Sequence, residues 1–145
     1  MADWLMKSEP DVNSYDDVVA RGVPEEWHSV RNYTARNNMK AMQLGDEAFF
    51  YHSNIGKEIV GIIKVVALAH PDSTAEPNEK GNIVWECVDV LPVKKLPKPV
   101  TLETIKKTPE LANMALVKLS RLSVSPVTDA EWKLICQMGG LKKAP

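Results

Sequence analysis

The sequence lacks the motifs by which most catalytic and cofactor-binding sites are recognised. It contains no G-x-S-x-G nucleophile turn, no G-x-G-x-x-G and no G-x-x-x-x-G-K-[ST] phosphate loop. Its three histidines show no H-x-x-x-H or H-E-x-x-H spacing, so we expect no metal site. Hydrolytic-triad, dinucleotide and P-loop chemistry therefore have no support, and we expect a protein without enzymatic activity and without a cofactor.

Cysteine and long apolar stretches are also scarce. Cys87 and Cys136 lie far apart with no C-x-x-C spacing, and each falls in an apolar run, which predicts buried thiols. No apolar stretch approaches the roughly 20 residues that a membrane span needs. The start, Met1-Ala2-Asp3-Trp4, has no basic or apolar region typical of a secretory signal. We therefore expect a soluble cytoplasmic protein, or a nuclear one if the source is eukaryotic, with no membrane partner.

Excess charge of either sign is missing too. The net charge is −1 over 145 residues, of which 44% are hydrophobic and 26% charged. This composition is ordinary for one globular domain, which we place over residues 1–145 and expect to be monomeric. Without a global positive charge, any contact with a polyanion must depend on local clusters of Lys and Arg. A protein with no polyanion partner is the alternative.

The patterning predicts several strands with short helices between them. Strands are expected from β-branched and aromatic content over 2–7, 47–52, 58–69 and 82–93, the last closing at Pro92 and the proline-rich 96–99. The stretch 116–124 alternates well enough to be a strand pair or a bent strand. Gly61, inside a strand, suggests a bulge or a tight bend. The polar stretch 70–81 is expected to be an exposed loop.

Helices are predicted where a capping side chain precedes an apolar stripe. They should follow Ser14, Asn32, Thr101 and Thr128. No βαβ alternation is evident, so parallel pairing is not expected. The prediction is an α+β fold, a small curved mixed or antiparallel β-barrel with short helices around it.

The stretch 27–39 is the most polar part of the chain beside an aromatic residue. It combines Trp27, Arg31 and Arg36 with three asparagines, a set typical of a site for a planar hydrogen-bonding ligand or a phosphate. The same pattern is typical of a solvated helix after a buried tryptophan. Polar groups at strand ends (Lys7-Ser8, Tyr51 to Asn54, Arg121 and Ser123) would line the mouth of one barrel if the fold brings them together. Such a pocket offers an aromatic face and groups for a base edge.

Five segments in order resemble the EVE domain family: W-L-M-K-S-E-P (4–10), V-R-N-Y-T-A-R-N-N-M (30–39), G-D-E-A-F-F-Y-H-S-N (45–54), I-V-G-I-I-K-V-V (59–66) and S-R-L-S-V-S-P-V (120–127). The resemblance runs from about residue 3 to 141. It implies a PUA-like fold, akin to YTH and ASCH domains. It also implies non-enzymatic binding of a modified base in nucleic acid, either modified cytosine in DNA or a modified base in RNA.

The resemblance also implies roles for single residues. Trp27 would stack on the base, Ser8, Asn32, His52, Ser53 and Asn54 would line the pocket, and Arg31, Arg36 and Arg121 would hold the sugar–phosphate backbone. The full expected ligand-binding set is Lys7, Ser8, Trp27, Val30, Arg31, Asn32, Arg36, Tyr51, His52, Ser53, Asn54, Arg121, Leu122 and Ser123. Glu25-Glu26 departs from the family pattern, and a negative pair there would weaken phosphate attraction. Trp27→Ala is expected to abolish preference for a modified base without affecting folding.

Two other functions stay open. One is a PUA-like enzyme acting on a modified nucleoside, with His52 or Lys7 as acid–base catalyst. The other is a small-metabolite sensor or partner-binding module, which the near-neutral charge suggests. Turnover that is lost on His52→Gln would favour the enzyme, and nucleic-acid affinity insensitive to salt would favour the sensor.

Overall fold

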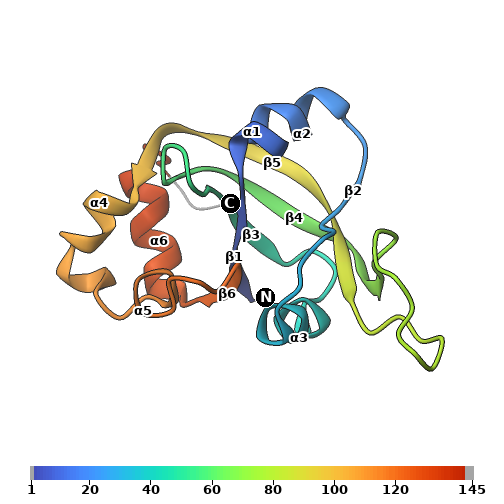
Figure 1. Ribbon diagram of the computed structural model, residues 1–145. Helices are drawn as coiled ribbons and strands as arrows, with labels where there is room; N and C mark the ends of the chain where they lie inside the picture. The colour runs from blue at the N-terminus through green and yellow to red at the C-terminus, as the bar shows by residue number, and fades with distance from the viewer. Residues whose placement is uncertain (1, 143–145) are drawn as a thin grey trace.

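One six-stranded sheet organises the chain in the computed structural model, which describes residues 2–142 (Figure 1). The strands are β1 (Asp3–Ser8), β2 (Glu25–Glu26), β3 (Glu47–His52), β4 (Glu58–Pro71), β5 (Glu86–Thr101) and β6 (Val124–Val127). They are ordered β2-β5-β4-β3-β1-β6. The fold is α+β, as predicted.

The sheet is mixed because β1 and β3 run parallel, whereas its other neighbouring strands are antiparallel. The expectation that parallel pairing would be absent was therefore wrong. Residues 9–46 join β1 to β3 and contain three helices and β2, which provides the long crossover that a parallel pair needs. The sequence pattern hides this crossover because β2 is only two residues long and interrupts the run of helices.

Short helices surround the sheet. They are α1 (Pro10–Asn13), α2 (Tyr15–Arg21), α3 (Tyr33–Ala41), α4 (Leu102–Lys106), the 3-10 helix η1 (Pro109–Leu111), α5 (Ala115–Lys118) and α6 (Asp129–Met138). Four predicted caps are confirmed, since the side chains of Ser14, Asn32, Thr101 and Thr128 each accept a backbone N–H three residues on. Ser14 and Thr128 form full capping boxes, so these helix starts are determined locally.

The central strands are buried on both faces. In β1, Trp4 and Met6 belong to one apolar cluster and Leu5 to a second, and in β3 Phe50 and Phe49 divide in the same way. Helices α2 and α3 contribute to the first cluster, while α4, α5 and α6 gather over the second (Figure 1). Burial on both faces explains why residues 47–52 read as an almost continuous apolar run rather than an alternating one.

Strand β5 differs from its prediction at both ends. It begins at Glu86 rather than residue 82 and continues through the prolines to Thr101. Beyond Val90 no strand of the described sheet pairs with its outer edge, because β2 pairs only with Val90 and Asp89. Its register with β4 passes from Gly61–Lys95 directly to Ile59–Val100, so residues 96–99 form a bulge. Proline is tolerated at such positions because no ladder donor is lost.

The predicted strand over 116–124 was also wrong. Residues 115–118 form α5, and a turn follows in which the Leu122 N–H donates to the Leu119 carbonyl at 2.9 Å. Only Val124 begins a strand, β6. The alternation was misleading because the two buried leucines belong to different elements: Leu116 lies in a helix and Leu122 in a turn, so they do not share one face of a strand.

Two further expectations about the core are confirmed. Gly61 lies at register shifts of β4, and a Cβ there would lie 2.4 Å from Cε1 of the buried Tyr15 ring. Cys87 and Cys136 are buried free thiols, and burial raises the pKa of Cys87 to about 12 and that of Cys136 to about 11. Within residues 2–142 no helix is long and apolar enough to cross a membrane.

Candidate functional site

A cavity of about 880 Å³ opens beside the end of β1 and the segment that follows β2. Six of the predicted site residues line it: Lys7, Ser8, Trp27, Val30, Arg31 and Ser123. The α1–β2 region supplies most of the remaining wall, including Asn13, Arg21 and Glu25. Its volume lies within the roughly 300–1,000 Å³ range of small-molecule sites, and a nucleobase fits in such a space.

Trp27 is both a wall of this cavity and a member of the core. Its N–H donates to the Val88 carbonyl at 2.9 Å, which extends the β2–β5 pairing by one residue. Its side chain packs edge-to-face on Phe50 with ring centroids 5.3 Å apart, and the residue is only 6% exposed. Truncating so buried an aromatic costs about 3–5 kcal/mol. The expectation that Trp27→Ala leaves folding unaffected therefore does not hold.

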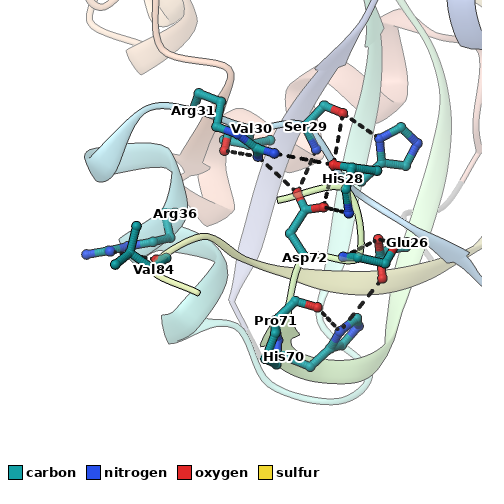
Figure 2. Close-up of polar contacts among 12 residues, drawn as sticks. Glu26, His28, Ser29, Val30, Arg31, Arg36, His70, Pro71, Asp72 and Val84 are labelled. Atoms are coloured by element: carbon teal, nitrogen blue, oxygen red, sulfur yellow. Dashed lines mark hydrogen bonds and ion pairs between the residues drawn. The ribbon is translucent and has the colours of Figure 1, made fainter. Parts of the chain in front are cut away.

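The segment after Trp27 is anchored by Asp72, which is 2% exposed. Asp72 Oδ2 accepts the Ser29 N–H at 2.7 Å and Arg31 Nη1 at 3.1 Å (Figure 2). Its Oδ1 accepts the backbone N–H and the hydroxyl of Thr74, at 2.8 and 2.6 Å. Burial raises the pKa of Asp72, but these hydrogen bonds outweigh burial and hold the pKa below its usual value. The carboxylate is thus the charged centre that positions Ser29 and Arg31 at the cavity.

Sequence reasoning missed Asp72 by treating 70–81 as an exposed loop. A local signal was present, since Asp72-Ser73-Thr74 matches the side-chain-to-backbone turns that Asp, Ser and Thr form. That signal predicts the two bonds to Thr74. It does not predict the contacts with Ser29 and Arg31, which lie 43 and 41 residues away in the chain.

Arg31 and Arg36 lie at opposite ends of a stacked column of side chains. The Tyr33 and Trp85 rings stack with centroids 4.8 Å apart. Arg31 Cζ lies 5.6 Å from the Trp85 centroid, and Arg36 Cζ lies 4.8 Å from that of Tyr33. Each guanidinium is also held by hydrogen bonds, Arg31 to Asp72 and Arg36 to the Val84 carbonyl. The two cations are therefore fixed in place at low conformational-entropy cost.

The acidic pair beside Trp27 is held by local hydrogen bonds, and Glu25 also forms an ion pair with Arg21. Glu25 accepts from the Arg21 side chain at 2.6 Å and from Asn13 Nδ2 at 2.5 Å. Glu26 accepts both the N–H and the hydroxyl of Ser73, at 3.1 and 2.6 Å. Because Arg21 compensates the charge of Glu25, that carboxylate opposes a phosphate at the cavity rim less than its sequence position suggests, whereas Glu26 keeps its charge.

The β1 side of the cavity is held by main-chain contacts. The Lys7 N–H donates to the Ser123 carbonyl at 2.9 Å, which joins two predicted site segments. Lys7 Nζ donates to the Ser120 carbonyl at 2.7 Å, and burial lowers the pKa of Lys7. The Ser8 hydroxyl donates to the Asn13 carbonyl at 2.6 Å. The fold thus brings Lys7, Ser8 and Ser123 together as predicted, although the hydroxyl proton of Ser8 is already donated to the Asn13 carbonyl.

The 51–54 hairpin lies outside the cavity lining. The His52 ring nitrogen Nε2 accepts the Tyr15 N–H at 3.1 Å, and burial lowers the pKa of His52, so both favour the neutral form of the ring. Asn54 Nδ2 donates to Glu9 Oε1 at 2.6 Å, and the Ser53 N–H donates to the Ser8 carbonyl. Tyr51 belongs to the apolar cluster on the opposite face of the sheet. These four residues support the β1–β3 end rather than the cavity.

The remaining predicted residues are also outside the lining. Asn32 caps α3 by accepting the Ala35 N–H at 2.9 Å, and Arg36 lies on Tyr33 at the outer end of the column. Leu122 is buried in the core, and Arg121 is exposed. The structure therefore brings six of the fourteen residues to one cavity and leaves eight outside it, and a ligand role for all fourteen stays a prediction.

Comparisons with known proteins agree with this architecture. The family profile of the EVE domain matches residues 2–138. Human thymocyte nuclear protein 1 is 36% identical over 165 residues, covering 93% of this chain and 72% of the relative. A crystal structure of an Agrobacterium tumefaciens protein is 50% identical with a TM-score of 0.91, covering 100% of this chain and 99% of that one.

A third comparison includes a ligand. The crystal structure of human THYN1 protein in complex with 5-methylcytosine containing DNA matches with a TM-score of 0.86 and 33% identity, covering 100% of both chains. The mixed sheet and short helices described above thus match those structures, consistent with a PUA-like fold. On the family match and these identities, the chain belongs to the EVE domain family.

Proposed function

We propose that this protein binds a modified nucleobase in nucleic acid, first of all modified cytosine in DNA, and holds the base in the cavity beside Trp27 without transforming it. The observation that carries the proposal is a cavity with an aromatic wall in a chain whose human relative was solved with 5-methylcytosine containing DNA. A base can enter such a cavity only from a single strand or after leaving the duplex stack.

The lining suits this role through its mixture of surfaces. Trp27 and Val30 supply apolar contact for the base and its added group, while Ser8, Ser123 and the nearby backbone supply polar groups for the base edge. An aromatic contact with one base is worth about 1–3 kcal/mol. The wall is held in place by Phe50, so little ordering of the protein is needed on binding.

Arg31 is the strongest candidate for the phosphate backbone. It lines the cavity, is itself exposed, and is oriented by Asp72 and by stacking on Trp85. Arg36 at the far end of the column would contact a neighbouring phosphate. Such contacts release counterions, so affinity should fall steeply as salt rises, which a small-metabolite sensor would not show.

The enzyme alternative receives less support from the geometry. His52 does not line the cavity, and its Nε2 is occupied by the Tyr15 N–H. Lys7 does line the cavity, but its Nζ is bonded to the Ser120 carbonyl. Neither group is thus positioned with a free acid or base function, which supports binding without turnover.

The test compares two matched substitutions, Trp27→Phe and Trp132→Phe. Both residues are buried and each packs on a phenylalanine of β3, but Trp132 lies in the cluster on the opposite face of the sheet. We expect comparable losses of stability. Only Trp27→Phe should reduce the preference for oligonucleotides with 5-methylcytosine over cytosine, by about 5–10-fold, because it shortens the aromatic wall.

Fluorescence anisotropy with methylated and unmethylated DNA, and with the matched RNA, measures this preference directly. Equal affinity of the wild-type protein for modified and unmodified oligonucleotides of both kinds would refute the proposal. If Trp27→Phe and Trp132→Phe change the preference for 5-methylcytosine equally, Trp27 is not part of the binding site.

A further inference from the structure

We propose that Glu26, His70 and Cys87 form a binding site for one transition-metal ion of the zinc class, which adjoins the cavity and shares Glu26 with its wall. Their ligand atoms, a carboxylate oxygen, a ring nitrogen and the thiol sulfur, all lie within 4.8 Å of one another. Bond lengths of 2.0–2.3 Å place tetrahedral ligands roughly 3.3–3.8 Å apart. Side-chain adjustments of about 1 Å would therefore complete the geometry.

The register of the sheet explains why these residues meet. His70 in β4 is paired with Cys87 in β5, and Glu26 in β2 is paired with Asp89 in β5. Cys87 and Asp89 are two residues apart in one strand and so share a face. Three neighbouring strands thus place all four side chains together on one face.

The donor set suits a borderline-soft cation. Thiolate and imidazole select zinc-class ions over magnesium or calcium, and a carboxylate supplies a third ligand. Asp89 Oδ1 lies 2.7 Å from His70 Nε2. In metal sites, an outer carboxylate orients a histidine ligand in the same way. The other ring nitrogen, His70 Nδ1, then lies on the side of Glu26, 3.9 Å from Glu26 Oε2 (Figure 2).

The electrostatic surroundings also favour a cation. The Cys87 thiol is fully buried, and its pKa is raised to about 12 by burial and by the charges of Glu26, Asp72 and Asp89, against which Arg31 acts in the opposite sense. A divalent ion would compensate this negative charge and displace the thiol proton. His70 also faces the Pro71 carbonyl at 3.1 Å through Nδ1, so a proton on that nitrogen competes with the metal. Affinity should therefore rise with pH.

A bound ion would join the short strand β2 to β4 and β5. Trp27 directly follows Glu26, so the ion would also stabilise the strand that leads into the cavity wall. The sequence conceals such a site because its ligands are 44 and 17 residues apart and follow no metal-binding motif. The absence of H-x-x-x-H spacing excludes ligands on one helix turn but does not address ligands from three strands.

The test uses the chain's two buried cysteines as a matched pair. Reduced protein is titrated with Co²⁺ and Zn²⁺ near pH 8, and stoichiometry, Co²⁺–thiolate charge-transfer absorption and the Zn²⁺-induced Tm shift are measured. We expect one ion per chain, with the thiolate band lost in Cys87→Ser and retained in Cys136→Ser, which lies on the opposite face of the sheet. His70→Gln should weaken affinity at least 10-fold.

No binding at one ion per chain, or a thiolate band that survives Cys87→Ser, would overturn the proposal. If Cys87→Ser does not fold, His70→Gln decides alone, because the His70 side chain is one-third exposed and tolerates substitution. Unchanged affinity in His70→Gln would then refute the site. No nucleic acid takes part in these measurements, so their outcome is independent of base binding.

Discussion

Asp72→Asn tests most directly whether the buried carboxylate organises the cavity. Asparagine has the same shape but only one accepting oxygen, so the donors at one position must lose their acceptor. If the amide nitrogen replaces Oδ2, the Ser29 N–H and Arg31 lose their partner, and if it replaces Oδ1, both Thr74 donors do. The first orientation disrupts two of the four bonds, and the second disrupts the one from the Thr74 N–H, since the Thr74 hydroxyl can turn to accept from the amide.

The expected cost follows from burial. Hydrogen bonds to a charged group contribute about 1.5–3 kcal/mol each, and breaking a buried ion pair costs about 3–5 kcal/mol. The Arg31 side chain is 38% exposed, so water weakens its ion pair with Asp72 and reduces the contribution of that pair to stability. We therefore expect the free energy of unfolding to fall by about 3 kcal/mol. The control is Asp16→Asn, since Asp16 pairs with Lys95 at 2.9 Å but is 73% exposed, and should lose less than about 1 kcal/mol.

Urea denaturation at pH 7 measures both values, and anisotropy with methylated DNA shows whether affinity falls with the position of Arg31. The low pKa of Asp72 gives a second readout. Its stabilisation is present above the unfolded value, near 3.8, and is lost as pH falls through the folded value, so the wild type and Asp72→Asn should converge in acid. A loss in Asp72→Asn no larger than in Asp16→Asn would refute the role given to Asp72.

Two further predictions concern the sheet. Gly61→Ala should lower the free energy of unfolding by about 1–3 kcal/mol, because its methyl group would lie 2.4 Å from the Tyr15 ring. The control is Gly81→Asn, which has nothing within 4 Å and should lose less than about 1 kcal/mol. Equal losses in urea denaturation would contradict this prediction. The hydrogen bond to Asp89 raises the pKa of His70 above 6.5, so its stabilisation is complete below that pH and is lost as pH rises through the folded value. The difference in urea midpoint between wild type and His70→Gln should therefore shrink from pH 6 to pH 8, and a constant difference would argue against the charged pair.

Local chemistry explains which elements could be predicted. A capping side chain acts on an amide three residues away, so Ser14, Asn32, Thr101 and Thr128 mark their helices without tertiary information. The hairpin between β3 and β4 depends on a turn that is equally local. Gly61 is visible in the sequence as a glycine within a strand, but the need for glycine comes from the distant Tyr15 ring. Burial of Cys87 and Cys136 followed from their apolar neighbours.

The wrong predictions all depended on distant partners. Whether a proline ends β5 depends on whether its edge is paired, and β2 leaves most of that edge free. Whether 116–124 is strand or helix depends on which face it buries, since Leu116 and Leu122 suit both patterns. The parallel pairing of β1 with β3 depends on the path of the intervening helices.

The sequence by itself determined the fold class, the four capped helix starts and the family, because these depend on short-range patterns and on motifs in order along the chain. Only the tertiary structure decided the site. It placed Trp27 in the core as well as in the cavity wall, joined Lys7 to Ser123, directed His52 to a backbone N–H, and made Asp72 the anchor of Ser29 and Arg31. Contacts between residues this far apart in the chain depend on strand register and loop path, which no local pattern encodes.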